Sequence, residues 1–141
     1  MLTISILLSA MSVTDLRSLQ VPLKLSLSLM AYGAYLALHS FDLDQIGIKV
    51  LITVSLVLLA YIPYRKNNII WLGGADVLVL VGLLFAVELK SWLILCYVAI
   101  ILAGVVGVIL RLLNRDIVYL PFVPFITGAF WGCYIWGALQ I

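Results

Sequence analysis

Long apolar stretches recur along the whole chain, and short polar segments separate them. The stretches are too long for strands, and they lack the alternation of apolar and polar residues that marks the strands of a membrane barrel. The chain is 66% hydrophobic and only 10% charged, whereas about a quarter of a soluble domain is charged. In lipid, a helix satisfies its backbone hydrogen bonds internally. The sequence therefore predicts an all-α fold, a polytopic membrane protein built as a bundle of about six transmembrane helices.

The apolar stretches define the candidate spans. They cover residues 2–15, 22–39, 46–62, 69–87, 91–110 and 117–139. Each connection between them is only a few residues long, which leaves no room for a second folded unit. We therefore predict a single transmembrane domain over residues 1–141.

Basic residues predict how the bundle is oriented. Beside the first, third and fifth connections lie Arg17, Lys24, Arg65, Lys66, Arg111 and Arg115. Only Lys49 and Lys90 accompany the second and fourth, and we expect Lys24 and Lys49 at the membrane interface. Because cytoplasmic loops are enriched in Lys and Arg, this pattern indicates a multi-pass protein of the cell membrane with both termini outside. The net charge of +2 is too small to suggest nucleic acid as a partner.

Two aspartates stand at the predicted cytoplasmic ends of spans. Asp15 is near the end of the first span, and Asp76 is near the start of the fourth. An acid inside an apolar run is rare unless a function or a partner requires it. A simpler interpretation stays open, in which Asp15 pairs with Arg17 and Asp76 favours the positive end of its helix.

Three segments carry a resemblance to a known family. DLRSLQVP at 15–22 resembles the first aspartate motif of type IV prepilin peptidases, and GGAD at 73–76 resembles their Gly-x-Gly-Asp motif. PFVPF at 121–125 is similar to the Pro-Phe-x-Pro-Phe segment that opens the last helix of that family. The motif residues are Asp15, Arg17, Pro22, Gly73, Gly74, Ala75, Asp76, Pro121, Phe122, Pro124 and Phe125.

The resemblance implies an intramembrane aspartic peptidase in which Asp15 and Asp76 form the catalytic pair. One carboxylate takes a proton from water while the other, protonated, polarises the scissile carbonyl. This chemistry requires no metal and no cofactor. The other motif residues would shape the site. The small residues 73–75 let a substrate strand approach the backbone, and the prolines begin the second and sixth helices, where a missing N–H costs little.

The chain departs from the family pattern at three positions. Ala75 stands where the family has Gly, Leu23 where Asn follows the proline, and Leu78 where a Lys is frequent. Long members of the family carry a cysteine-rich domain between the first helices and also methylate the new pilin N-terminus. Here that connection is short and contains no cysteine. The resemblance is therefore to the small peptidase-only or archaellin-peptidase-like members, and we predict no methyltransferase activity.

The implied function is removal of the leader peptide from type IV pilin-like or archaellin-like precursors at the cytoplasmic membrane face. The precursor protein and the lipid bilayer would be the partners. Two alternatives remain: a non-catalytic homologue or scaffold for pilin assembly, and a small transport subunit that uses the two acids as a proton relay. A relay requires further ionisable groups toward the outside. Apart from Lys24, Lys49 and His39, which lies by the outer connection far from both aspartates, spans two, three, five and six contain no charged residue or histidine, which favours the peptidase.

Overall fold

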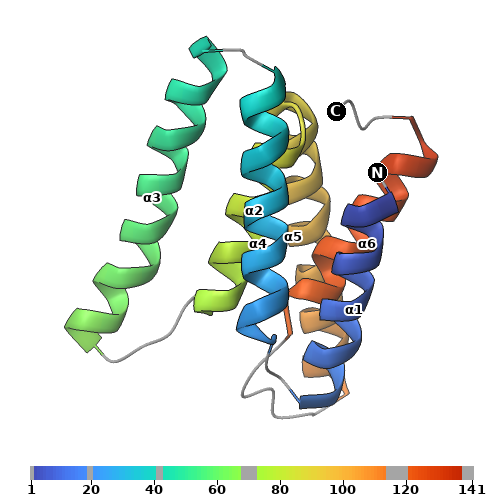
Figure 1. The fold of residues 1–141 in the computed structure, drawn as a ribbon. Coiled ribbons are helices and arrows are strands. Elements are labelled where there is room, and N and C mark those ends of the chain that lie inside the picture. Colours follow the sequence, from blue (N-terminus) through green and yellow to red (C-terminus); the bar gives the residue numbers. More distant parts are fainter. Residues whose placement is uncertain (1, 19–20, 41–42, 68–72, 114–120, 138–141) are drawn as a thin grey trace. The chain divides into compact units, whose positions relative to one another are not determined.

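A computed structural model describes residues 2–18, 21–40, 43–67, 73–113 and 121–137 (Figure 1). Every regular element in these ranges is an α-helix, which confirms the all-α prediction. The helices are α1 (Leu2–Ser18), α2 (Leu23–Ser40), α3 (Leu43–Asn67), α4 (Gly74–Ala86), α5 (Leu89–Leu112) and α6 (Val123–Ile135).

Helices α4 and α6 are shorter than the predicted spans, whereas α3 extends beyond the predicted residues 46–62 at both ends. The prediction begins the fourth span at residue 69, whereas α4 begins at Gly74 because Gly73 has an extended backbone with φ −64° and ψ 143°. The sixth span was predicted from residue 117, but α6 begins at Val123, after Pro121. Both helices also end earlier than predicted, at Ala86 and Ile135. Residues 69–72 and 117–120 lie outside the described ranges.

Within the described ranges, α5 is the one helix that is long and apolar enough to cross a membrane by length and composition. It contains 24 residues and is therefore about 36 Å long at ~1.5 Å per residue. By contrast, α4 and α6 contain 13 residues each, about 20 Å against a hydrocarbon core of ~30 Å. The described helices thus support membrane insertion through α5.

The chain divides into two compact units. The first contains residues 1–21 and 90–140, and the second contains residues 22–89. In the first unit, α1 packs along α6 (Figure 1). The completely buried side chains of this seam are Ile4, Leu8 and Met11 from α1 and Val123, Ile126 and Phe130 from α6. On α5, Leu102 approaches α6, since a Cβ added at Gly128 would lie 4.0 Å from its Cδ1.

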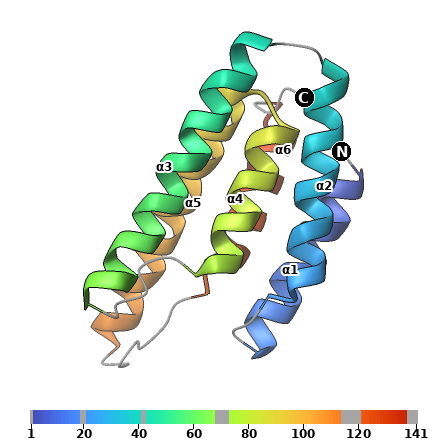
Figure 2. The same cartoon turned by 60° about the vertical axis from the view of Figure 1, so that its left-hand side comes forward.

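In the second unit, α4 lies between α2 and α3 (Figure 2). The backbones of α2 and α4 come into direct contact at Gly33, where an added Cβ would collide with the carbonyl oxygen of Gly82. On the other side, Lys49 of α3 is only 7% exposed and donates a hydrogen bond from Nζ to the carbonyl oxygen of Val87, at 3.0 Å. Lys49 is therefore buried against the C-terminal end of α4 rather than placed at an interface as predicted.

Candidate active site

Asp15 is buried because it continues the core-facing stripe of α1. Ile4, Leu8, Met11 and Asp15 recur at intervals of three or four residues, which places them on one side of a helix. The side chain of Asp15 is 2% exposed. Its carboxylate accepts a hydrogen bond from the backbone N–H of Val123, the first residue of α6. The first and third sequence motifs therefore meet in the first unit.

The start of α6 explains why that N–H is available. The N-cap residue Phe122 provides no side-chain hydrogen bond. Its carbonyl oxygen accepts the N–H groups of Phe125 at 3.0 Å and Ile126 at 3.2 Å, and Pro124 has no N–H. The N–H of Val123 is thus the remaining donor of the first turn, and Asp15 accepts it as a cap supplied by another helix.

One oxygen of Asp15 is left without such a bond. Its Oδ2 atom is buried and has no hydrogen-bond partner among the described residues. A buried carboxylate oxygen without a partner is energetically costly. Such an atom is available to a water molecule or to a substrate group.

Asp76 occupies the third position of α4, in the first turn of that helix. Its side chain is 5% exposed. Its Oδ2 accepts a hydrogen bond from the backbone N–H of Gly73, at 3.3 Å. This is the carboxylate half of a capping box, and Gly73 has no side chain to supply the other half. The carboxylate therefore lies at the positive end of its own helix.

The remaining residues of the first two motifs lie closer to the surface. Arg17 is exposed, and the described residues include no ion pair between it and Asp15. Pro22 is also exposed and immediately precedes α2, as predicted, with its carbonyl oxygen accepting the first N–H groups of that helix. Gly74 is exposed, and a Cβ added there would meet nothing within 4 Å. Ala75 is partly exposed. The residues of α4 that precede Asp76 therefore carry little side-chain bulk.

The residues of the third motif form the entry to α6. Pro121 and Phe122 precede the helix, Pro124 is its second residue, and Phe125 follows; all four are partly exposed. The predicted role of Pro124 in beginning the sixth helix is confirmed. The role of the segment as a neighbour of Asp15 depends on the fold, because the backbone N–H of Val123 makes that contact.

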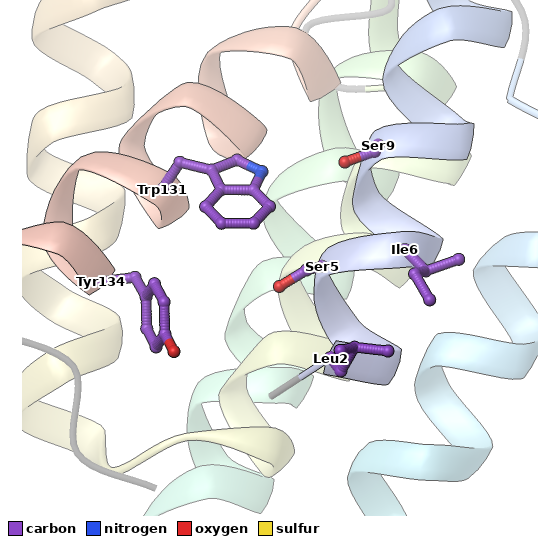
Figure 3. Close-up of a pocket in the computed structure, with 6 residues that line it drawn as sticks. All are labelled: Leu2, Ser5, Ile6, Ser9, Trp131 and Tyr134. Atoms are coloured by element: carbon purple, nitrogen blue, oxygen red, sulfur yellow. The ribbon is translucent and has the colours of Figure 1, made fainter.

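A groove of about 450 Å³ opens on the first unit. Its lining residues are Leu2, Ser5, Ile6, Ser9, Trp131 and Tyr134 (Figure 3). The Trp131 and Tyr134 rings of α6 face the serine side of α1 across it, and the two rings stack edge to face at 6.0 Å. Asp15 is not part of its lining. The groove therefore runs beside the first half of α1, away from the buried carboxylate.

Asp15 and Asp76 belong to different compact units. The structure describes the surroundings of each carboxylate within its own unit, and the pairing of the two stays a prediction. What the two sites share is chemical: each is a buried carboxylate that accepts a backbone N–H at the start of a helix. A buried acid held by a backbone N–H in this way has few orientations.

Among the polar side chains that the described part of the fold buries, sequence reasoning did not identify Ser26, Ser91 and Thr127, and it placed Lys49 at the membrane interface. Lys49 and Thr127 bond to backbone carbonyls, and Ser26 is completely buried. A polar residue inside an apolar helix was the available signal for each. The partners lie on other helices for Lys49 and Thr127, so sequence spacing alone does not reveal them.

Comparison with known proteins identifies the family. The family model described as the type IV leader peptidase family matches residues 2–108, which include both aspartate motifs and end before the third motif. No curated protein and no solved structure matches the chain. The match covers most of the chain and both buried acids, and the chain belongs to the type IV leader peptidase family.

Proposed function

We propose that this chain is an intramembrane aspartic endopeptidase that removes the leader peptide of type IV pilin-like or archaellin-like precursors at the cytoplasmic face. Family membership makes it a leader-peptidase-like protease. In the proposal, residues 1–141 form one domain of about six spans with both termini outside. Asp15 and Asp76 provide the catalytic pair, and no methyl transfer accompanies cleavage.

The observation that carries this proposal is the burial of two carboxylates within the family match. Asp15 and Asp76 are 2% and 5% exposed, whereas Glu88, the other acid whose side-chain burial the structure describes, is partly exposed. Burying an ionisable group is costly, so a protein keeps one where structure or chemistry requires it. The unpartnered Oδ2 of Asp15 supports the chemical interpretation, because a purely structural cap needs only the oxygen that accepts the N–H of Val123.

The proposed reaction uses one proton shared by the two acids. The ionised carboxylate takes a proton from water as the water oxygen bonds to the scissile carbonyl carbon. The protonated acid donates its proton to the carbonyl oxygen, which gives a neutral tetrahedral diol. The C–N bond then breaks, the first acid protonates the leaving amine, and a diol hydroxyl returns a proton to the second carboxylate. Both acids end in their starting protonation states.

Each acid has a structural feature suited to this cycle. Asp76 lies at the positive end of α4, which stabilises a negative charge. Asp15 is held by α6 through the N–H of Val123 and keeps an oxygen available for a second partner. The small residues before Asp76 allow an extended peptide to approach. These features support recognition of a peptide segment that leaves the membrane at its cytoplasmic face.

The test is cleavage of pilin-like precursors by the purified full chain in proteoliposomes. Asp15→Asn and Asp76→Asn keep the shape of each side chain and an acceptor for its backbone N–H. We expect each variant to reduce the rate by roughly 10²- to 10⁴-fold while still inserting and folding. Glu88→Gln serves as the control, because Glu88 is a partly exposed acid outside the motifs. Cleavage at the normal rate by both aspartate variants would overturn the proposal.

One observation favours a second candidate, a non-catalytic homologue that binds precursors during assembly. Both carboxylates accept backbone N–H groups at helix starts, and that role alone would keep an acid in place. In this case the wild-type chain would bind pilin-like precursors without cutting them. The same proteoliposome assay separates the two functions, since binding and product formation are measured together.

A further inference from the structure

Ser26 presents a buried hydroxyl that the fold does not satisfy. Its side chain is 0% exposed, and Oγ has no hydrogen-bond partner among the described residues. Ser28, two residues later on α2, makes the usual helical bond, from Oγ to the carbonyl oxygen of Lys24 at 2.8 Å. A hydroxyl buried without a partner is uncommon and calls for an explanation.

The start of α2 explains why Ser26 lacks the usual bond. The carbonyl oxygen four residues earlier is that of Pro22, which already accepts the N–H of Leu25 at 2.9 Å and the N–H of Ser26 at 3.3 Å. A carbonyl oxygen has two lone pairs, and both are used. The hydroxyl proton of Ser26 is therefore free to be donated elsewhere.

The packing of α2 on α4 shows which part of the unit this hydroxyl faces. Ser26 lies two turns before Gly33, so both residues occupy one side of α2, and at Gly33 that side contacts Gly82 of α4. A Cβ on Gly82 would lie 3.0 Å from Leu29 Cγ, and a Cβ on Gly33 would lie 3.4 Å from the backbone nitrogen of Ala86. From the first contact to the second, both helices therefore advance by four residues toward their C-terminal ends.

The two helices run in the same direction, with their N-terminal ends at the same end of this unit (Figure 1). Stepping back three residues from the contact between Leu29 and Gly82 brings Ser26 level with Val79 on α4. Asp76 precedes Val79 by three residues, so its Cα lies about 4.5 Å closer to the N-terminal end of α4 along the helix axis. Ser26 therefore faces α4 about one turn from Asp76, measured along the helix axis.

We propose that Ser26 is a positioning residue for Asp76, whose carboxylate receives a hydrogen bond from the Ser26 hydroxyl, directly or through one water molecule, during peptide cleavage. The inference rests on the proposed function. The N–H of Gly73 already holds Oδ2 of Asp76, and a carboxylate has about four acceptor sites in total. A further donor from α2 would help to fix the plane of the carboxylate relative to the attacking water.

Ser26→Ala tests this role, because removing the hydroxyl leaves the packing almost unchanged. We expect kcat for a pilin-like precursor to fall about 10- to 100-fold, the effect of losing one hydrogen bond to a charged group. KM and membrane insertion should stay at the wild-type values. The thermal midpoint should stay the same or rise, since the variant removes an unpaired buried polar group. Ser26→Thr keeps the hydroxyl and should restore kcat to within a few-fold of the wild type, as a conservative rescue.

Ser28→Ala is the matched control, because it makes the same change on the same helix at an exposed position. It should leave kcat unchanged. If Ser26→Ala cleaves at the wild-type rate, or if it loses activity only in proportion to lost folded protein, the positioning role is wrong. The failure of the proposed function has a different signature: the wild-type chain itself would not cleave, or Asp76→Asn would cleave normally.

Discussion

The backbone N–H of Val123 donates a hydrogen bond to the carboxylate of Asp15, which joins the first motif of the chain to the third. Val123 is the first residue of α6, and its N–H is the donor of the first turn that the helix itself leaves unused. The Pro-Phe-Val-Pro-Phe segment therefore has a direct structural relation to the candidate catalytic acid. Pro124 contributes by having no N–H of its own, so that one donor remains and it points to Asp15.

The first prediction concerns the distance between the two acids. If Asp15 and Asp76 share a proton, a structure determined in lipid nanodiscs should place their carboxyl oxygens about 2.6–3.2 Å apart, or bridged by one water. A separation well above ~10 Å in both unliganded and substrate-bound chains would leave the catalytic pair without support.

The second prediction concerns the close contact between α2 and α4. Gly33→Ala places a Cβ against the carbonyl oxygen of Gly82, where backbone rather than a flexible side chain must move. We expect a loss of roughly 1–3 kcal/mol of stability, measured as a lower midpoint of denaturation in detergent. Gly47→Ala is the control, because a Cβ at this exposed position of α3 meets nothing within 4 Å. It should gain up to about 1 kcal/mol from helix propensity. Equal effects at both positions would contradict the described packing.

The third prediction concerns Lys49 and the end of α4. Lys49→Met removes the donor to the carbonyl oxygen of Val87 and leaves the C-terminus of α4 without that partner. We expect a loss of about 1.5–3 kcal/mol, typical of a hydrogen bond to a charged group. Hydrogen exchange should increase in the last turn of α4. Lys90→Met is the control: it alters an exposed lysine three residues after Val87 and should change stability by less than ~0.5 kcal/mol. A neutral Lys49→Met would show that the bond adds nothing beyond the cost of burying the charge.

The fourth prediction concerns the seam between α1 and α6. Thr127 donates its hydroxyl to the carbonyl oxygens of Leu8, at 3.2 Å, and Val123, at 2.9 Å. Thr127→Val should cost about 0.5–1.5 kcal/mol and should lower the cleavage rate more than Thr53→Val. The hydroxyl of Thr53 bonds to the carbonyl oxygen of Lys49 within its own helix. A similar effect of both changes on stability and rate would show that the seam does not depend on this bond.

Much of the local structure follows from the sequence alone. Runs of apolar residues predict helices, since a helix satisfies its backbone in an apolar environment, and each described helix overlaps one predicted span. The sequence also predicts that Asp76 lies near the start of the fourth helix, and because α4 begins at Gly74, Asp76 lies in its first turn. The helix starts near Pro22 and Pro124 follow from the fixed φ and missing N–H of proline.

The surroundings of Asp15, Ser26 and Lys49 were decided by tertiary structure. The sequence places Asp15 near the end of an apolar span, but its burial and the donor that reaches it, which belongs to α6, depend on the packing of the helices. Lys49 is suited to an interface by sequence, whereas packing places it at the end of α4. Spacing along one helix determines which side chains share a face; which backbone groups of another helix meet that face depends on how the helices pack.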